Sequence, residues 1–494
     1  MSDSYELATP KPAALIESLR AIGYNLPTAI ADIIDNSISA GAKNVDVTFH
    51  WDGAQSWVRI LDDGRGMSEP ELFEAMRPGS QNPLQKRSAH DLGRFGLGLK
   101  TASFSQARRL TVASRRDGEV VSAREWDLDY VESVNEWRLL IEPSADSSFW
   151  LSSIESRRSG TAVLWTKLDR LTLTEQVFDA AEQGRFNDAI DHVRSYLALI
   201  FHRFLEDRTL KISINNIALH PWNPFYESHP ATYRTPVELI PFADSTLEFR
   251  GYVLPHKDKL TEDEFKMLGG LNGWNAHQGF YIYRNRRLLV FGDWLRLGAP
   301  SLWTREEHYR LARIRLDISN DTDAEWHLDV KKSTARPPAL IRDRLQDLGE
   351  NVRATARSVF AHRGKYGKRT AIVTPTERPW LSTVRENRRV YAINRDHPAV
   401  QAVVRAFPDN ALQLMGLLRL LEETVPVEQI WLDTAEQSRD HAAPYAGVEF
   451  SIIKADMRRV VEFLVKTGIN RQTAIERLRS VEPFDRYPKL INEL

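Results

Sequence analysis

The chain has 494 residues, no cysteine, and 66 lysines and arginines against 67 aspartates and glutamates. This length predicts about three domains, the balanced charge excludes a global field that would draw the protein to nucleic acid or membrane, and the lack of cysteine excludes disulfides and thiolate metal sites. The first ten residues lack the basic and apolar regions of a secretion signal, and no apolar run reaches the roughly 18 residues of a membrane span, so we expect a cytoplasmic protein.

The first informative segment is a helix predicted from Leu26 to Ala40, where isoleucines recur with a helical period. Asp32 and Asn36 are four residues apart, so they lie on one polar face of this helix. A carboxylate one turn from a carboxamide can hold a water beside a hard metal ion, and the Asn36 oxygen suits Mg²⁺ that also binds phosphate and water. A solvated polar face is the alternative for this segment alone. A short amphipathic helix over residues 13–22 is expected to pack beside it.

The second segment is a strand predicted at residues 57–61, which ends in the run from Asp62 to Met67. A carboxylate at the strand end can accept a hydrogen bond from an exocyclic amine such as that of adenine. Gly64 and Gly66 let the backbone turn and approach a ligand closely. An ordinary Asp-Gly turn is the alternative.

The third segment places three glycines ahead of a helical stretch over residues 97–106. Glycines at a helix N-terminus expose backbone N–H groups to phosphate, and the helix dipole adds to the attraction. A lysine in the first turn can neutralise phosphate charge. The spacing is that of neither a P-loop nor a dinucleotide-binding βαβ unit. The run consists of Gly93, Arg94, Phe95, Gly96, Leu97, Gly98, Leu99 and Lys100.

In this order and spacing the three segments resemble the nucleotide site of the GHKL ATPases, the superfamily of gyrase, heat-shock chaperones, histidine kinases and MutL. The likeness is greatest to its MORC-like bacterial branch. The N-box of that family, Glu-x-x-x-Asn, corresponds to Asp32 and Asn36, and its Asp-x-Gly-x-Gly corresponds to Asp62–Gly66. The family's Gly-x-x-Gly-x-Gly corresponds to Gly93–Gly98, and its Gly-Thr before a strand appears at Thr161.

The resemblance implies that ATP and Mg²⁺ are the ligands of this site. It makes Asp32 the general base, Asn36 the metal ligand and Asp62 the contact to adenine, with the Thr161 hydroxyl helping to hold that contact. The family usually has Glu where this chain has Asp32, whose side chain is one methylene shorter. Because a general base must come within about 3 Å of the attacking water, we expect slow ATP hydrolysis. Asp35 is a competing candidate for the base. It ranks second because its side chain points about 100° round the helix from Asn36.

The resemblance also implies a Bergerat-type two-layer α/β sandwich as an ATP-binding domain over residues 1–170. The polar segment 77–91 corresponds to an ATP lid, a plain surface loop being the alternative. A helix is predicted at residues 69–76. Strands are predicted at residues 44–50, 57–61, 109–114, 120–128, 137–141 and 161–165.

Residues 171–362 are predicted to form a second α/β domain, and the resemblance implies the ribosomal-protein-like fold of a GHKL transducer. In coupled GHKL enzymes a lysine of this domain contacts the γ-phosphate. The resemblance assigns this role to Lys332, with Lys331 as the second candidate. A solvated basic pair is the alternative. The basic run Arg284–Arg287 is expected either to contact DNA phosphates or to form a solvated hairpin rim. The predicted elements are a helical region at 174–205, strands at 209–219, 247–254, 279–283 and 314–318, and a helix at 338–361.

Residues 363–380 are polar and predicted to be a linker, and residues 381–494 are predicted to form a small α-rich domain. Two of its helices are joined by a short turn, as in a helix-turn-helix, but the mixed charge of the second favours helix packing or a dimer contact.

The sequence therefore predicts an Mg²⁺-dependent ATPase whose N-terminal domains dimerise or close on ATP in order to clamp or remodel DNA or a partner. By analogy with the MORC-like branch, it predicts a role in restriction or phage defence alongside other defence-system subunits. The alternatives are a nucleotide-gated scaffold with negligible turnover and a chaperone-like ATPase. A histidine kinase is disfavoured because fewer than 30 residues, too few for a phosphoacceptor helix, precede the first motif.

Overall fold

The computed structural model describes residues 10–21, 23–79, 98–172, 177–243, 245–319, 322, 325–326, 335–361, 377–385, 388–427, 430, 445 and 447–494. The chain divides into two compact units, residues 1–367 and residues 368–494. None of the helices in the described ranges is long and apolar enough to cross a membrane.

The first unit contains a seven-stranded sheet with the strand order β4-β3-β5-β2-β1-β6-β7. Its central strand β2 is almost entirely buried, which explains its continuous apolar run. Strands β1, β2, β5, β3 and β4 pair antiparallel in turn, whereas β6 runs parallel to β1. The strands are β1 (Asn44–His50), β2 (Trp57–Asp62), β3 (Arg109–Arg115), β4 (Ser122–Asp127), β5 (Gly160–Thr166), β6 (Lys211–Ile214) and β7 (Ile217–Ala218).

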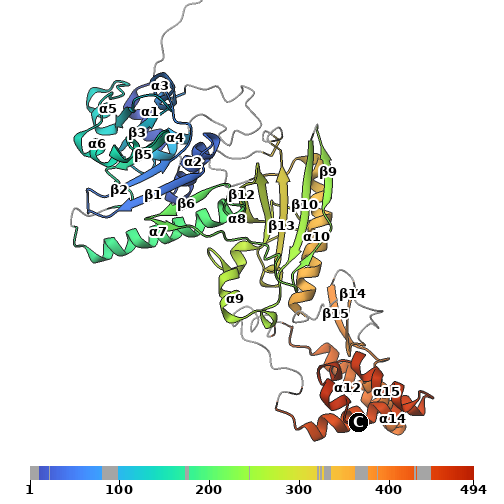
Figure 1. Ribbon diagram of the computed structural model, residues 1–494. Helices are drawn as coiled ribbons and strands as arrows, with labels where there is room; N and C mark the ends of the chain where they lie inside the picture. Colours follow the sequence, from blue (N-terminus) through green and yellow to red (C-terminus); the bar gives the residue numbers. More distant parts are fainter. Residues whose placement is uncertain are drawn as a thin grey trace, which may run out of the picture. The chain divides into compact units, whose positions relative to one another are not determined.

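Helices α2 (Leu26–Ser39), α4 (Gly98–Phe104) and α7 (Ala180–Ile200) share one hydrophobic core with this sheet (Figure 1). The start of α2 is fixed by Asn25, whose side chain accepts a hydrogen bond from the Thr28 N–H at 3.0 Å. Ile30, Ile33 and Ile34 of α2 are buried in this core. The predicted α/β sandwich is therefore confirmed. The remaining helices here are α1 (Pro12–Arg20), α3 (Glu69–Met76), α5 (Leu128–Val134) and α6 (Ala145–Leu151).

Two strand predictions differ from the structure. Residues 137–141 form no strand, and only one bridge joins Leu140 to Glu125. The strands predicted at 209–219 exist, and Asn215 and Asn216 form their two-residue turn with positive φ angles of 49° and 63°. They extend the first sheet, however, because β6 pairs with β1 instead of joining the second sheet.

The second sheet of this unit has the order β12-β11-β13-β10-β8, with β9 also pairing with β10. Strands β11 and β13 are parallel, and the long helix α10 (Ala339–Ala361) packs on β10 and β13. Helix α8 (His202–Glu206) joins α7 to this region, and α9 is Glu262–Gly269. The strands are β8 (Tyr233–Arg234), β9 (Glu238–Phe242), β10 (Ser245–Val253), β11 (Gly279–Arg284), β12 (Arg287–Asp293) and β13 (Ala312–Ile318).

The second unit is rich in helices, as predicted, and also contains a hairpin of β14 (Trp380–Arg385) and β15 (Arg388–Ile393). Its core is formed by the apolar face of α14 (Phe450–Lys466) with Leu478 and Phe484. The other helices described in this unit are α11 (Pro398–Ala406), α12 (Ala411–Glu423), α15 (Arg471–Arg477) and α16 (Pro488–Ile491).

Candidate nucleotide site

Helix α2, the loop after β2 and the start of β5 each contribute a hydrogen bond to the carboxylate of Asp62. Its Oδ2 accepts a hydrogen bond from the Ser37 hydroxyl on α2 at 2.8 Å, and its Oδ1 accepts from the N–H groups of Gly64 at 2.9 Å and Thr161 at 3.2 Å. Burial raises the pKa of Asp62 and outweighs the lowering by these three bonds. The Thr161 hydroxyl lies 2.9 Å from Ser114 Oγ. The backbone of Thr161, rather than the hydroxyl named by the sequence, therefore contacts Asp62.

The loop after β2 is pressed against β3 at Gly66. Gly66 has a φ of +68°, and a Cβ there would lie 1.9 Å from the carbonyl oxygen of Arg115. Only glycine fits a position that combines this backbone angle with so close an approach. The following N–H, of Met67, donates to Ser114 Oγ at 2.9 Å. The second motif is thus held rigidly at the strand end.

The polar face of α2 brings the first and third motifs together. Asp32 is buried, and its Oδ2 accepts a hydrogen bond from the Tyr24 hydroxyl at 2.8 Å. A Cβ on Gly98, at the start of α4, would lie 3.6 Å from that same oxygen. Asn36 is exposed one turn further along α2, and Ser37 beside it contacts Asp62. The first two motifs and Gly98, the described end of the third glycine run, therefore lie close together.

Asp35, the second candidate base, is engaged in a buried ion pair. Its side chain is 1% exposed, and its Oδ1 accepts a hydrogen bond from Nε of Arg287 at 3.2 Å. The Nη2 atom of Arg287 lies 4.0 Å from Oδ1 of Asp32. Asp35 is therefore more deeply buried than Asp32, whose side chain is 8% exposed.

Sequence reasoning missed Arg287. Both expectations for its basic run, a DNA contact and a solvated rim, are wrong for Arg284 and Arg287, because each is at most 3% exposed. The sequence around Arg287 did not signal this burial, because the two-residue turn at Asn285 and Arg286, which makes Arg287 the first position of a strand, is seen in the structure alone.

Lys100 is buried in α4, where its ammonium donates a hydrogen bond to the Ala75 carbonyl near the end of α3 at 2.8 Å. Burial lowers the pKa of Lys100 from 10.5 to about 8. In this arrangement the lysine holds α3 to α4, and its contact to phosphate stays a prediction. Leu99 is partly buried against the main core. Outside the described residues lie Gly93, Arg94, Phe95, Gly96, Leu97, the lid from residue 80 onward, Lys331 and Lys332.

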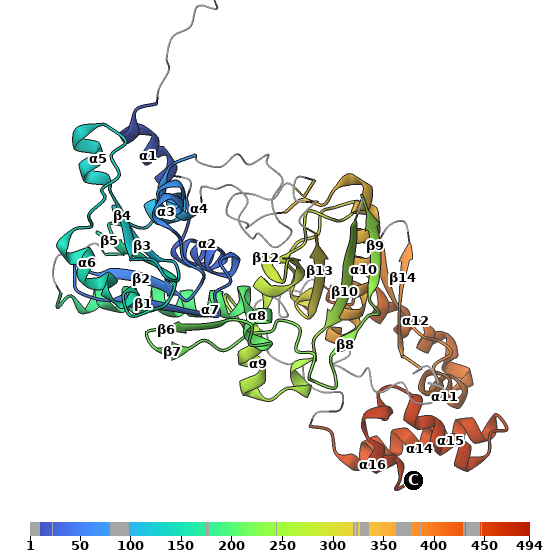
Figure 2. The same cartoon turned by 45° about the horizontal axis from the view of Figure 1, so that its top comes forward.

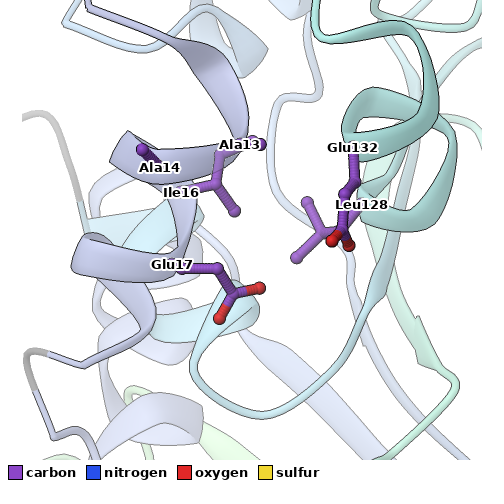
Figure 3. Close-up of a pocket in the computed structure, with 6 residues that line it drawn as sticks. All are labelled: Ala13, Ala14, Ile16, Glu17, Leu128 and Glu132. Atoms are coloured by element: carbon purple, nitrogen blue, oxygen red, sulfur yellow. The ribbon is translucent and has the colours of Figure 1, made fainter.

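A separate cavity of about 240 Å³ lies between α1 and α5 (Figure 3). Its apolar lining includes Ile16 and Leu128, and none of the motif residues lines it. Its two acidic residues, Glu17 and Glu132, both pair with Arg108, at 3.3 and 3.0 Å. Within the described ranges, no group of three or more His, Asp or Glu side chains is placed to bind a metal ion.

Residues 24–161 match the family profile described as "Histidine kinase-, DNA gyrase B-, and HSP90-like ATPase". This chain carries a GHKL ATPase domain. "ATPase morc-1" of Caenorhabditis elegans is 28% identical to it over 95 residues, which cover 19% of this chain and 11% of that protein. "DNA mismatch repair protein MutL" of Rhodospirillum rubrum is 33% identical over 92 residues, which cover 18% of this chain and 14% of that protein. The match thus spans less than a fifth of these GHKL relatives.

A solved N-terminal domain of a DNA repair protein overlaps 71% of this chain and 98% of its own chain, with a TM-score of 0.40 and 13% identity. The family assignment of the GHKL domain confirms the resemblance that its motifs indicated.

Proposed function

We propose that this chain binds ATP with Mg²⁺ in the site formed by α2, the end of β2, the start of β5 and α4, and that it hydrolyses ATP slowly. The observation that carries the proposal is the convergence on Asp62 and Asp32. Asp62 is held by Ser37 and two backbone N–H groups, while Asp32 lies beside Gly98. A fixed buried carboxylate is suited to the adenine amine, and a second one near the glycine-bordered helix start is suited to the phosphate end.

The residues present fit an Mg²⁺ ion that is held mainly by nucleotide. Mg²⁺ in phosphate sites takes one or two protein oxygens and completes its shell with phosphates and water. Asn36 offers one neutral oxygen from an exposed position on the same face as Asp32. When bound, the ion would neutralise phosphate charge, and the chain's own part is to orient the nucleotide and to accept a proton from water at Asp32.

Slow turnover is supported by the contacts of Asp32. One of its oxygens accepts from Tyr24 and the other lies near Arg287, so the carboxylate is already engaged. The same contacts favour the second candidate function, a nucleotide-gated scaffold with negligible hydrolysis. A measurable turnover that depends on Asp32 would exclude this second function.

The proposal extends to the rest of the chain by resemblance to the MORC-like branch. It assigns residues 1–170 to the ATPase domain, 171–362 to a transducer, 363–380 to a linker and 381–494 to an α-rich domain, except that α7, β6 and β7 belong with the ATPase domain because they complete its core and sheet. It assigns γ-phosphate sensing to Lys332 or Lys331, and it includes ATP-dependent homodimerisation, clamping or remodelling of DNA, and a role in cytoplasmic phage defence with other subunits. The name of one relative, a DNA mismatch repair protein, supports the link to DNA.

ATP hydrolysis and equilibrium nucleotide binding by wild type and variants test the proposal. We expect Asp32→Ala to bind ATP and lose hydrolysis, and Asp62→Ala to lose ATP binding. We expect Asn36→Ala to bind Mg²⁺ more weakly and so to lose Mg²⁺-supported hydrolysis. The matched control is Asn351→Ala, which removes an exposed asparagine from α10. Equal nonzero turnover in all of these proteins would overturn the assignment. Measuring the molecular size of the protein with a non-hydrolysable ATP analogue, in the presence and absence of DNA, tests dimerisation.

A further inference from the structure

The hairpin between β11 and β12 brings a buried cation to the nucleotide-binding helix. Its two-residue turn, Asn285 and Arg286, has positive φ angles of 46° and 71°, the geometry that matches the twist of paired strands. Arg287 is therefore the first residue of β12, and β12 lies beside α2 and α8 (Figure 2).

The side chain of Arg287 is 2% exposed, and its guanidinium contacts three neighbouring groups. Its Nε donates to Asp35, its Nη1 donates to the Leu288 carbonyl at 2.7 Å, and its guanidinium carbon lies 5.8 Å from the centre of the Phe201 ring. A charge this deeply buried is costly unless it is paired. The pair with Asp35 thus joins β12 to α2 across a sequence separation of 252 residues.

The same guanidinium lies next to Asp32. One oxygen of that carboxylate accepts from Tyr24 and the other lies 4.0 Å from Nη2 of Arg287, so the side chain is held from both ends. Asp35 lies three residues further along α2, nearly one turn. A shift of β12 therefore moves the helix face that carries Asp32.

The hairpin is itself anchored to α8. Arg203 of α8 forms two hydrogen bonds with Asp317 of β13, at 2.5 and 3.1 Å, and its guanidinium lies 3.5 Å from the centre of the Tyr283 ring on β11. His202 lies 2.8 Å from the Tyr283 hydroxyl. These contacts hold β11 and β13 at a set distance from α8 and so fix where Arg287 meets α2.

We propose that Arg287 is a positioning residue for ATP hydrolysis, which holds Asp32 in place through Asp35 and thereby makes the base depend on the second sheet. The proposal rests on the proposed function, because it assigns Asp32 as the base. Arg287 differs from the lysine expected at the γ-phosphate, since its partners are carboxylates of α2.

Steady-state ATP hydrolysis by Arg287→Gln tests this role, with Arg286→Gln as the matched control. Arg286 belongs to the same turn, but it is 43% exposed and pairs with Asp207 rather than α2. We expect Arg287→Gln to lower kcat about 10- to 100-fold, the range that a misplacement near 1 Å produces, with KM for ATP changed by less than about threefold. Arg287→Lys, which keeps the charge, is expected to recover part of kcat.

Arg287→Gln leaves Asp35 buried without its partner, so the double variant Asp35→Asn/Arg287→Gln guards against simple unfolding. We expect it to melt near wild type and to keep the low kcat. Suppose that wild type hydrolyses ATP and Asp32→Ala does not. A double variant with the kcat of wild type would then overturn the positioning role of Arg287 and leave the proposed function standing. A wild type that binds ATP without turnover overturns this role and the proposed function together.

Discussion

Lys100 gives a quantitative test of how tightly α3 and α4 pack. Its ammonium is 2% exposed and is bonded to the Ala75 carbonyl, and burial lowers its pKa from 10.5 to about 8. Between these two values the unfolded chain binds a proton that the folded chain releases, so stability rises with pH. At about 1.4 kcal/mol per pKa unit, the whole gain is about 3 kcal/mol. Below pH 8 both states are protonated and the gain is absent.

The assay is urea unfolding of wild type and Lys100→Met at several pH values from 7 to beyond 10. Other groups titrate equally in both proteins, so the difference in unfolding free energy isolates Lys100. We expect wild type to gain about 3 kcal/mol relative to the variant between pH 8 and pH 10.5. Parallel curves across this range would refute a buried ammonium at Ala75.

Three further outcomes follow from single contacts. Gly66→Ala should lower the melting temperature by several degrees, through the clash with β3, more than Gly41→Ala, which shares a positive φ but has no neighbour within 4 Å. Ser37→Ala should weaken ADP binding about tenfold in calorimetric titration, since a hydrogen bond to a charged group is worth roughly 1.5–3 kcal/mol, while Ser18→Ala on α1 should not. Burial lowers the pKa of His277 to about 3, so wild type should lose stability relative to His277→Gln as pH falls from 6.5 toward 3 in acid unfolding.

The local elements of the ATPase sheet could be predicted because their signals are local. The period of α2, the apolar run of β2 and the Asp-Gly loop each depend on residues within one short segment. Helix α3 likewise has the bounds predicted for it, residues 69–76.

What could not be predicted depends on contacts between distant segments. Nothing near β6 in sequence shows that it pairs with β1, because the two strands lie more than 160 residues apart in the chain. The burial of Arg287 is hidden in the same way, since a basic residue near a turn is exposed in most sequences, and the carboxylates beside its charge, Asp35 and Asp32, lie far along the chain.

The parallel pairing of β6 with β1 matters for anyone cutting this chain into fragments. A piece ending at residue 170 would leave one side of β1 without its hydrogen-bonding neighbour and would strip Phe186, Val193 and Leu197 of α7 from the core. Bare strand edges recruit other chains and aggregate. A soluble ATP-binding fragment should therefore be sought with its breakpoint after Leu219, and a shorter piece that stays monomeric would show that β1 tolerates an open edge.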